Sequence, residues 1–160
     1  MALLNRKVDY AILVLSHLHE HKVGGSAREI SGRFGLSRAF VANILKELCH
    51  KGFVSSHRGV KGGYVIDPRA TAVTLGDFIA SMDDTFHLAE CNHHAPNAVR
   101  CSVFDCCTVR GPIAAVHDRI RSVLRQVTLG ELFHPTAGPS LSLMGLPMVD
   151  AGSVAAPVAQ

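Results

Sequence analysis

Residues 26–52 of the chain read SAREISGRFGLSRAFVANILKELCHKG, and this stretch decides the fold. Ser26 and Glu29 have the spacing of a capping box, which predicts a short helix that ends near Gly35. Ser37 is a favourable N-cap for a second helix that carries an apolar stripe. The stripe consists of Val41, Ile44, Leu45 and Leu48. Two helices joined by a tight, glycine-containing turn, with the second partly buried, are the outline of a helix-turn-helix.

A basic hairpin is expected to follow these two helices. Residues 53–57 and 64–66 predict its strands, and residues 58–63, RGVKGG, predict its tip. Glycines allow the backbone to approach a surface closely, and Arg58 and Lys61 supply cations for phosphate or for a narrow minor groove. After a helix-turn-helix, we interpret this hairpin as a DNA-binding wing, with an ordinary surface hairpin of solvated charges as the alternative.

We expect duplex DNA to contact the exposed face of the second helix together with the wing. The candidate contact residues are Ser37, Arg38, Ala39, Asn43, Lys46, Arg58, Lys61, Gly62, Gly63 and Tyr64. Residues 1–66 carry ten Lys and Arg against four Asp and Glu, whereas the rest of the chain carries six against nine. A basic half suggests a polyanionic partner on that side, and a mildly basic surface that serves solubility is the alternative.

The C-terminal half predicts a long amphipathic helix and a tail. Pro112 suits a first helical turn, and apolar residues then recur at helical spacing as far as Val127. So long a stripe needs a partner surface, which is either the protein's own core or a second copy. We therefore predict a winged helix-turn-helix domain (1–82), a cysteine sensor segment with a dimerisation helix (83–133) and a disordered tail rich in Pro, Gly, Ala and Ser (134–160). The predicted fold is mainly α with a small β-hairpin.

The composition indicates the cellular compartment and the chemistry expected of the thiols. We find no charged-then-apolar leader and no apolar run long enough to span a bilayer, so we expect a cytoplasmic protein with no membrane partner. The chain has five cysteines, an odd number that cannot close into a full set of disulfides. In a reducing compartment, clustered cysteines more often bind a metal or sense redox state.

Four of these cysteines crowd into one short segment together with two histidines. They are Cys91, His93, His94, Cys101, Cys106 and Cys107. Thiolates are soft ligands that suit iron-sulphur clusters, and a mixed set of Cys and His can also hold zinc in tetrahedral geometry. A cluster-free thiol switch that uses the adjacent Cys106 and Cys107 is the third interpretation. These residue types alone leave the three open.

Several segments resemble a known family. They are Lys7-Val8-Asp9-Tyr10-Ala11, Gly52-Phe53-Val54-Ser55-Ser56-His57-Arg58-Gly59 with Gly62-Gly63-Tyr64, Glu90-Cys91, and Val127-Thr128-Leu129-Gly130-Glu131-Leu132. The family comprises the winged-helix repressors that include the iron-sulphur-cluster regulator IscR, the nitric-oxide sensor NsrR, the iron regulator RirA and the cysteine-metabolism regulator CymR. The resemblance runs from about residue 5 to about residue 133, and the wing string is its most distinctive part.

The resemblance implies a homodimer that binds a partly palindromic operator in double-stranded DNA. Many members also hold an iron-sulphur cluster, either [4Fe-4S] or [2Fe-2S]. Members with a cluster usually use three cysteines, and the resemblance assigns Cys91, Cys101 and Cys107 to these positions. Cys106 is then an extra thiol, and the gap between Cys91 and Cys101 is longer than usual.

The fourth ligand separates the types within the family. Members like IscR use a histidine three residues after the third cysteine, where this chain has Arg110. Members like NsrR use an aspartate on the first helix of the partner subunit, and Asp9 matches that position. The ligand pattern is therefore more similar to that of NsrR. The expected signal is iron or cluster status, redox state or nitric oxide.

Other classes of function have weaker support in the sequence. A thiol enzyme would need a nucleophile, a base and a substrate pocket, and we find neither a nucleotide-binding loop nor a nucleophile elbow. We therefore do not expect an enzyme. A module that only binds a partner protein is compatible with the family but has no residue signature here.

Overall fold

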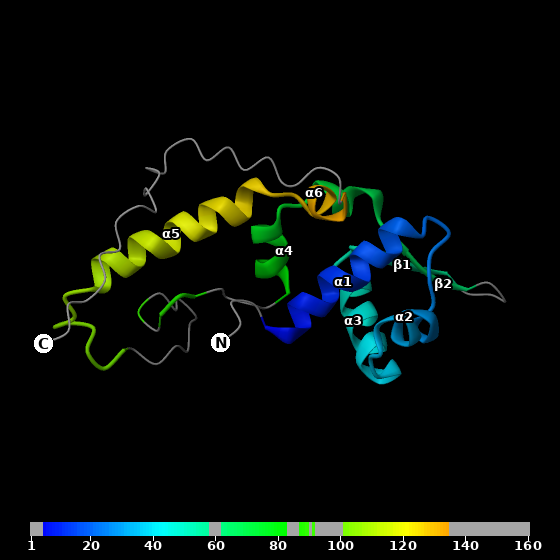
Figure 1. Ribbon diagram of the computed structural model, residues 1–160, viewed down its shortest axis with the longest axis horizontal. Helices are drawn as coiled ribbons and strands as arrows, with labels where there is room; N and C mark the ends of the chain where they lie inside the picture. The colour runs from blue at the N-terminus through cyan, green and yellow to red at the C-terminus, as the bar shows by residue number, and fades with distance from the viewer. Residues whose placement is uncertain (1–4, 58–61, 83–86, 90, 92–100, 135–160) are drawn as a thin grey trace, which may run out of the picture.

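The computed structural model describes residues 5–57, 62–82, 87–89, 91 and 101–134 (Figure 1). These residues form a mainly helical fold with one two-stranded sheet, which confirms the predicted fold class. The elements in chain order are α1 (Arg6–Glu20), α2 (Ala27–Phe34), α3 (Arg38–His50), β1 (Val54–His57), β2 (Gly63–Ile66), the 3-10 helix η1 (Pro68–Ala72), α4 (Leu75–Ser81), α5 (Arg110–Gln126) and α6 (Leu129–Phe133).

The helix-turn-helix begins and ends where its capping residues stand. The Ser26 hydroxyl accepts a hydrogen bond from the amide of Glu29 (3.2 Å), and the Ser37 hydroxyl accepts one from the amide of Phe40 (3.2 Å). Each bond satisfies an amide that has no partner within its own helix. Gly35 follows α2 with a φ of +63°, a left-handed conformation that glycine adopts at little cost.

The hairpin is joined to the turn that precedes α2. Strands β1 and β2 pair antiparallel, with Ser56 opposite Tyr64. Tyr64 also pairs with Gly25: the amide of each donates to the carbonyl of the other, at 2.9 and 3.0 Å. The hairpin is therefore held at Tyr64 by the turn before α2 as well as by α3. The sequence analysis did not predict the pairing of Tyr64 with Gly25.

A second backbone bridge joins the N-terminal ends of α4 and α6. Thr74 and Thr128 cap α4 and α6, and they form an isolated antiparallel bridge. The amide of Leu75 donates to the carbonyl of Val127 (2.7 Å), and the amide of Leu129 donates to the carbonyl of Val73 (2.9 Å). Helix α5 begins far from α1–α3 and runs back toward them, and α6 follows at its near end (Figure 1).

One core joins α1, α2, α3, α4 and α6. Its fully buried members are Val8, Ala11, Val14, Leu15, Leu18, Ile30, Val41, Leu45, Leu48, Phe78, Met82 and Leu129. Removing each large apolar side chain from water contributes roughly 1.5–3 kcal/mol before the cost of ordering the chain. Every member of the predicted stripe on α3 is buried, so the periodicity of that stretch was interpreted correctly.

The division at residue 82 stays a prediction. Phe133 and Leu129 of α6, from the predicted second unit, belong to the same core cluster as α1. The predicted tail lies outside the described residues from residue 135 onward. Within the described part of the chain, no helix is both long and apolar enough to cross a membrane.

Candidate nucleic-acid interface and sensor segment

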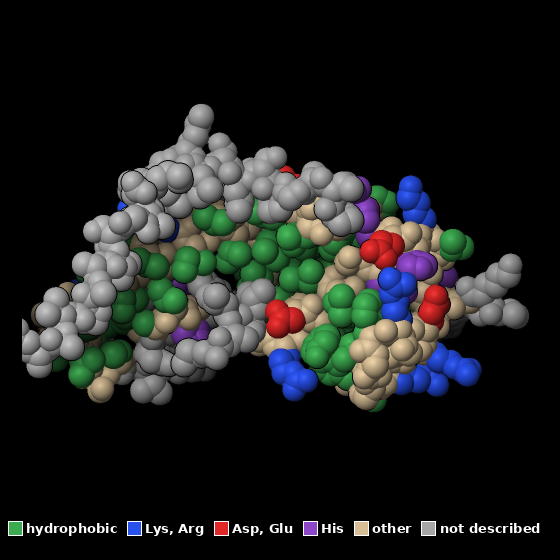
Figure 2. Space-filling view, in the orientation of Figure 1, with side chains coloured by type: hydrophobic (Ala, Val, Ile, Leu, Met, Phe, Trp, Pro, Cys, Tyr) green, Lys and Arg blue, Asp and Glu red, His purple; other side chains and the backbone are tan. Residues whose placement is uncertain are grey.

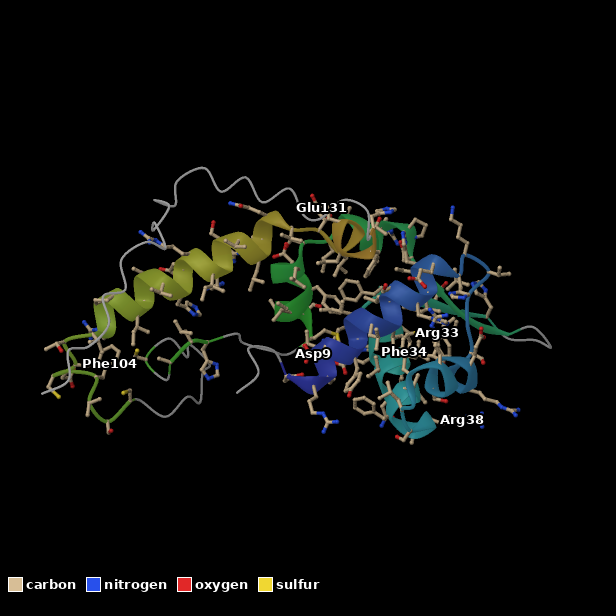
Figure 3. All side chains as sticks on the ribbon, in the orientation of Figure 1. Asp9, Arg33, Phe34, Arg38, Phe104 and Glu131 are labelled. Carbon is tan, nitrogen blue, oxygen red and sulfur yellow. The ribbon has the colours of Figure 1, made fainter. Side chains whose placement is uncertain are left out.

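Helix α3 presents a polar face to solvent on the side opposite its buried stripe. All five predicted contact residues on it are exposed: Ser37, Arg38, Ala39, Asn43 and Lys46. Figure 2 shows Lys and Arg side chains around the end of the molecule that α1, α2 and α3 form, and Figure 3 places Arg38 at the outer edge of α3. The face therefore combines two cations with a short hydroxyl and an amide, which are donors that suit phosphates and base edges.

The end of β2 next to the tip of the wing is in close backbone contact with Gly25. A side chain at Gly63 would place its Cβ 2.9 Å from the carbonyl oxygen of Gly25, so this position has no room for one. Gly62, Gly63 and Tyr64 are half-buried. Gly63 and Tyr64 therefore each have a structural role in the contact with Gly25, which does not involve DNA. Arg58 and Lys61 lie outside the described residues.

The thiols of the sensor segment differ in exposure. Cys91, Cys101 and Cys107 are half-buried, whereas Cys106 is exposed. The Cys106 thiol donates to the carbonyl of Val103 (3.5 Å). His93 and His94, the nitrogen donors of the zinc interpretation, lie outside the described residues.

Arg110, at the start of α5, folds back onto Phe104 of the sensor segment. Its guanidinium carbon lies 4.3 Å from the ring centroid of Phe104, and its Nη1 donates to the Phe104 carbonyl (3.4 Å). A guanidinium has no free lone pair to offer a metal, so Arg110 cannot replace a ligating histidine. It instead contacts Phe104, which stands between Cys101 and Cys107 in the sequence.

The proposed ligands are not gathered within one protomer. Asp9 is exposed near the start of α1, and Figure 3 shows it well apart from Phe104, which stands between Cys101 and Cys107. Among the described residues, no three Cys, His, Asp or Glu side chains are arranged to hold a metal ion. The donor types fit an iron-sulphur cluster, since three half-buried thiols are soft ligands, but the described part of one chain does not complete a ligand set.

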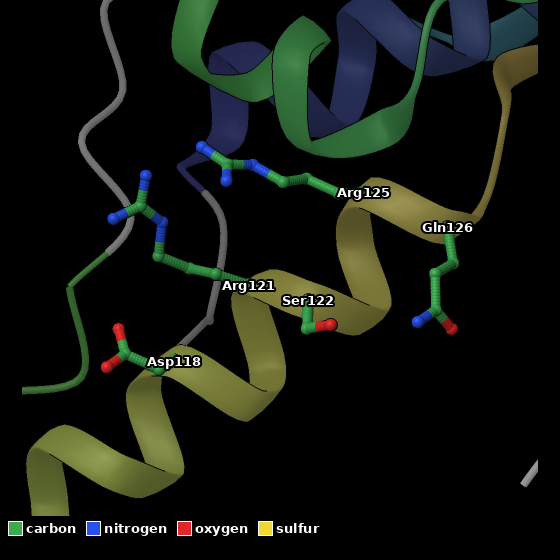
Figure 4. Close-up of a pocket in the computed structure, with 5 residues that line it drawn as sticks. All are labelled: Asp118, Arg121, Ser122, Arg125 and Gln126. Carbon is green, nitrogen blue, oxygen red and sulfur yellow. The ribbon is translucent and has the colours of Figure 1, made fainter. Parts of the chain in front are cut away.

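A pocket lies along α5. Its volume is about 400 Å³, and its described lining residues are Asp118, Arg121, Ser122, Arg125 and Gln126. Figure 4 shows Arg121 and Arg125 extending from the same side of the helix. This described lining contains neither cysteine nor histidine, the two residue types of the thiol-enzyme alternative.

A histidine that the sequence analysis passed over is among the buried polar residues of the fold. His17 is 3% exposed, its ring stacks on that of His21 with centroids 4.2 Å apart, and neither of its ring nitrogens has a hydrogen-bond partner. Burial lowers the pKa of His17, and the neighbouring His21 and Arg33 lower it further. Its place three residues after Val14, on the buried side of α1, was the available signal.

Comparison with known proteins agrees with this arrangement. A family model described as "Rrf2: Iron-dependent Transcriptional regulator" matches residues 4–135. The HTH-type transcriptional regulator IscR of Escherichia coli O1:K1 / APEC is 28% identical over 131 residues, which are 81% of this chain and 78% of that protein.

Solved structures share the fold. CymR, the global cysteine regulator of B. subtilis, superposes with a TM-score of 0.64 at 22% identity, over 83% of this chain and 97% of that one. T. potens IscR superposes with a TM-score of 0.60 at 23% identity, over 81% of this chain and 84% of that one. The oxidized form of Staphylococcus aureus CymR gives 0.58 at 24% identity, over 84% and 97%.

Proposed function

Because the chain belongs to the Rrf2 family of transcriptional regulators, we propose that it is a dimeric repressor whose affinity for operator DNA depends on an iron-sulphur cluster. The observation that carries the DNA-binding part is the fully exposed polar face of α3, backed by a fully buried stripe. The cluster part is supported by three half-buried thiols in one segment of a chain whose family model is described as iron-dependent.

Helix α3 is the element that enters the major groove in this proposal. Ser37 and Arg38 stand at its N-terminal end, which is where recognition helices of this kind contact base edges and phosphates. Asn43 is one turn further along and can donate to and accept from the edge of an adenine. Lys46 supplies a phosphate contact, as would Arg58 and Lys61 at the tip of the wing.

A second copy of the chain covers α5. Val109, Val116 and Val123 are 53%, 47% and 44% exposed and recur every seven residues. Ile113 and Ile120 lie between them and are half-buried, which completes an alternating spacing of three and four. Figure 2 shows hydrophobic side chains along the α5 side of the molecule. Two such helices related by a two-fold axis would place two reading helices against a partly palindromic operator.

The cluster would be held by Cys91, Cys101 and Cys107 of one subunit and Asp9 of the partner subunit. A cluster supplies a group that gains or loses electrons and loses iron readily, and oxygen ligation by a carboxylate leaves one corner labile. The chain's own residues would hold the thiols in one segment, through the contact of Arg110 with Phe104. Because Asp9 stands on the partner's α1, the ligand set would link the two subunits and favour one dimer geometry.

A cluster-free thiol switch is the second candidate. It is favoured by the exposure of Cys106 beside Cys107, because an accessible thiol can be oxidised and can pair with another. CymR, which shares the fold, has been solved in an oxidized form. A Cys106→Ala variant with intact redox response would remove this candidate, whereas the cluster proposal expects that result.

DNA binding is tested with the purified dimer, loaded and apo, against a pool of random duplexes. We expect selection of a partly palindromic sequence, and a salt dependence whose slope falls by about one for each phosphate contact removed, as in Lys46→Ala. Asn43→Ala should instead relax preference at one base position and cost roughly 1–3 kcal/mol. Equal affinity for selected and random duplexes would refute the proposal.

The ligands are tested by anaerobic purification of single variants, with iron and sulphide analysis. We expect Cys91→Ala, Cys101→Ala and Cys107→Ala to lose iron and colour, and Cys106→Ala to retain both. Asp9→Ala should alter the spectrum of the cluster and shorten the lifetime of the cluster. A colourless Cys106→Ala beside a coloured Cys107→Ala would exchange these two roles.

A further inference from the structure

Glu47 of α3 is paired with Lys7 of α1 and with Lys51, which caps the C-terminal end of α3 itself. Its Oε1 lies 3.0 Å from Nζ of Lys7 on α1 and 3.9 Å from Nζ of Lys51 at the end of α3. The Lys51 ammonium also donates to the carbonyl of Ser81, the last residue of α4. The Glu47 side chain is 24% exposed, so its ion pairs are screened less than most pairs on a protein surface.

The ion-pair network of Glu47 ends at Lys7 and at Ser81, and both are close in sequence to residues of the proposed sensor. Lys7 precedes Asp9 by two residues on α1. Ser81 ends α4, and from there the chain runs on toward Cys91. Glu47 itself follows Lys46 directly, at the edge of the exposed face of α3.

We propose that Glu47 is a positioning residue that transmits the state of the sensor to the reading helix, through Lys7 on one side and Lys51 on the other. The inference rests on the proposed function, since it requires α3 to read DNA and Asp9 and the cysteines to respond to a signal. A shift of α1, or of the end of α4, changes the distance from one lysine to Glu47. The ion pairs then favour one orientation of α3 over another.

A change in the sensor can shift the equilibrium between two orientations of α3 only as far as the interactions that link sensor and helix differ between those orientations. Weakening both pairs at Glu47 therefore lowers the coupling between sensor and operator without removing the DNA-contacting residues, which lie on the exposed face. The expected signature is a change in the ratio of two affinities, which a purely structural role would not produce.

The main test uses Glu47→Gln in the full-length protein, which removes the charge and keeps the size of the side chain. Wild type and variant, each loaded anaerobically or apo, are titrated with a duplex that the wild-type protein selects from a random pool. Regulatory coupling usually amounts to about 5- to 150-fold in affinity, and we expect the ratio of loaded to apo affinity to fall at least about threefold. The cluster spectrum should remain that of wild type, since Glu47 is not a ligand.

Hydrogen exchange provides a readout that does not depend on DNA. In the wild type, the protection of α3 amides should differ between the loaded and apo forms, and in Glu47→Gln this difference should shrink. Lys7→Met and Lys51→Met separate the two branches, and each should lower the affinity ratio by part of the amount seen for Glu47→Gln.

The matched control is Glu20→Gln. Glu20 pairs with Arg33 at 3.6 Å at the far end of α1, and both side chains are about half exposed. This variant should keep the wild-type affinity ratio. A wild-type ratio in Glu47→Gln overturns the inference and leaves the proposed function intact, whereas a wild-type protein whose affinity ignores its cluster state overturns both.

Discussion

Tyr10 of α1 packs edge-on against Phe40 of α3, with ring centroids 5.4 Å apart and ring planes at 90°. The amide of Phe40 is the one that Ser37 caps, so the contact holds the first turn of α3, which also carries Arg38. The guanidinium carbon of Arg6 lies 5.9 Å from the Tyr10 ring centroid and extends the contact to the start of α1. The N-terminal turn of the proposed reading helix is thus fixed by α1.

Replacing Phe40 should weaken both the fold and DNA binding. Phe40→Leu removes an edge-to-face aromatic pair. It should therefore lower the free energy of unfolding by about 1 kcal/mol more than the loss of buried apolar area alone would cost. Operator affinity should fall as well, since the first turn of α3 becomes less fixed. Urea unfolding and fluorescence anisotropy measure the two effects. A cycle with Tyr10→Leu should be non-additive by roughly 0.5–1.5 kcal/mol, and additive effects would show that the rings are not coupled.

Two glycines offer opposite outcomes for the same substitution. Gly24 has a φ of +90°, and a Cβ there would lie 2.6 Å from the carbonyl oxygen of Tyr64, so Gly24→Ala should cost about 2 kcal/mol or more and displace the wing. Gly32 lies within α2, where a Cβ would meet nothing within 4 Å. Gly32→Ala should therefore stabilise the protein by about 0.5–1 kcal/mol. Denaturant midpoints compare the two, and equal effects would contradict the close approach at Gly24.

Charge on the exposed stripe of α5 should prevent dimerisation. Val116→Glu and Val123→Glu each place a carboxylate where the second copy is proposed to pack, and we expect the dimer to weaken by at least about 2 kcal/mol, or roughly 30-fold. Arg121→Glu makes a larger change of charge in the pocket on another side of α5 and should leave the dimer intact. Analytical ultracentrifugation decides between them. Dimers of unchanged affinity in both valine variants would mean that the subunits meet elsewhere.

His17 should make the stability depend on pH. Burial holds the pKa of His17 below its ordinary value of 6.5, so the unfolded chain binds a proton there more readily than the folded one. The contribution is fully present above pH 6.5 and is lost as the pH falls through the lower pKa of the folded state. His17→Phe should flatten the loss of stability that sets in as the pH falls below about 6.5.

The control for this pH dependence is His50→Gln. His50 is exposed at the end of α3, so its replacement should leave the profile of the wild type almost unchanged. Thermal or urea unfolding at a series of pH values gives both profiles. A His17→Phe protein that still loses stability over the same range would assign the effect to other groups.

Features that depend on neighbours a few residues away could be read from the sequence. Ser26 and Ser37 begin their helices because a hydroxyl lies three residues before the amide that it caps, and Gly35 ends α2 because only glycine takes a left-handed conformation at little cost. The buried stripe of α3 follows from the helical period, and the exposed face is its complement. The family resemblance, which the matching family model confirms, also rests on such local strings.

Contacts between distant segments were decided only by the tertiary structure. The bridge of Gly25 with Tyr64, the bridge of Thr74 with Thr128 and the ion pair of Glu47 with Lys7 each join residues whose local patterns do not point to one another. The same holds for the burial of His17 and for the exposure of Cys106, because both depend on which segments cover a side chain. A hydrogen-bond cap is encoded by spacing along one helix, whereas a pairing across the fold depends on where the whole core places its helices.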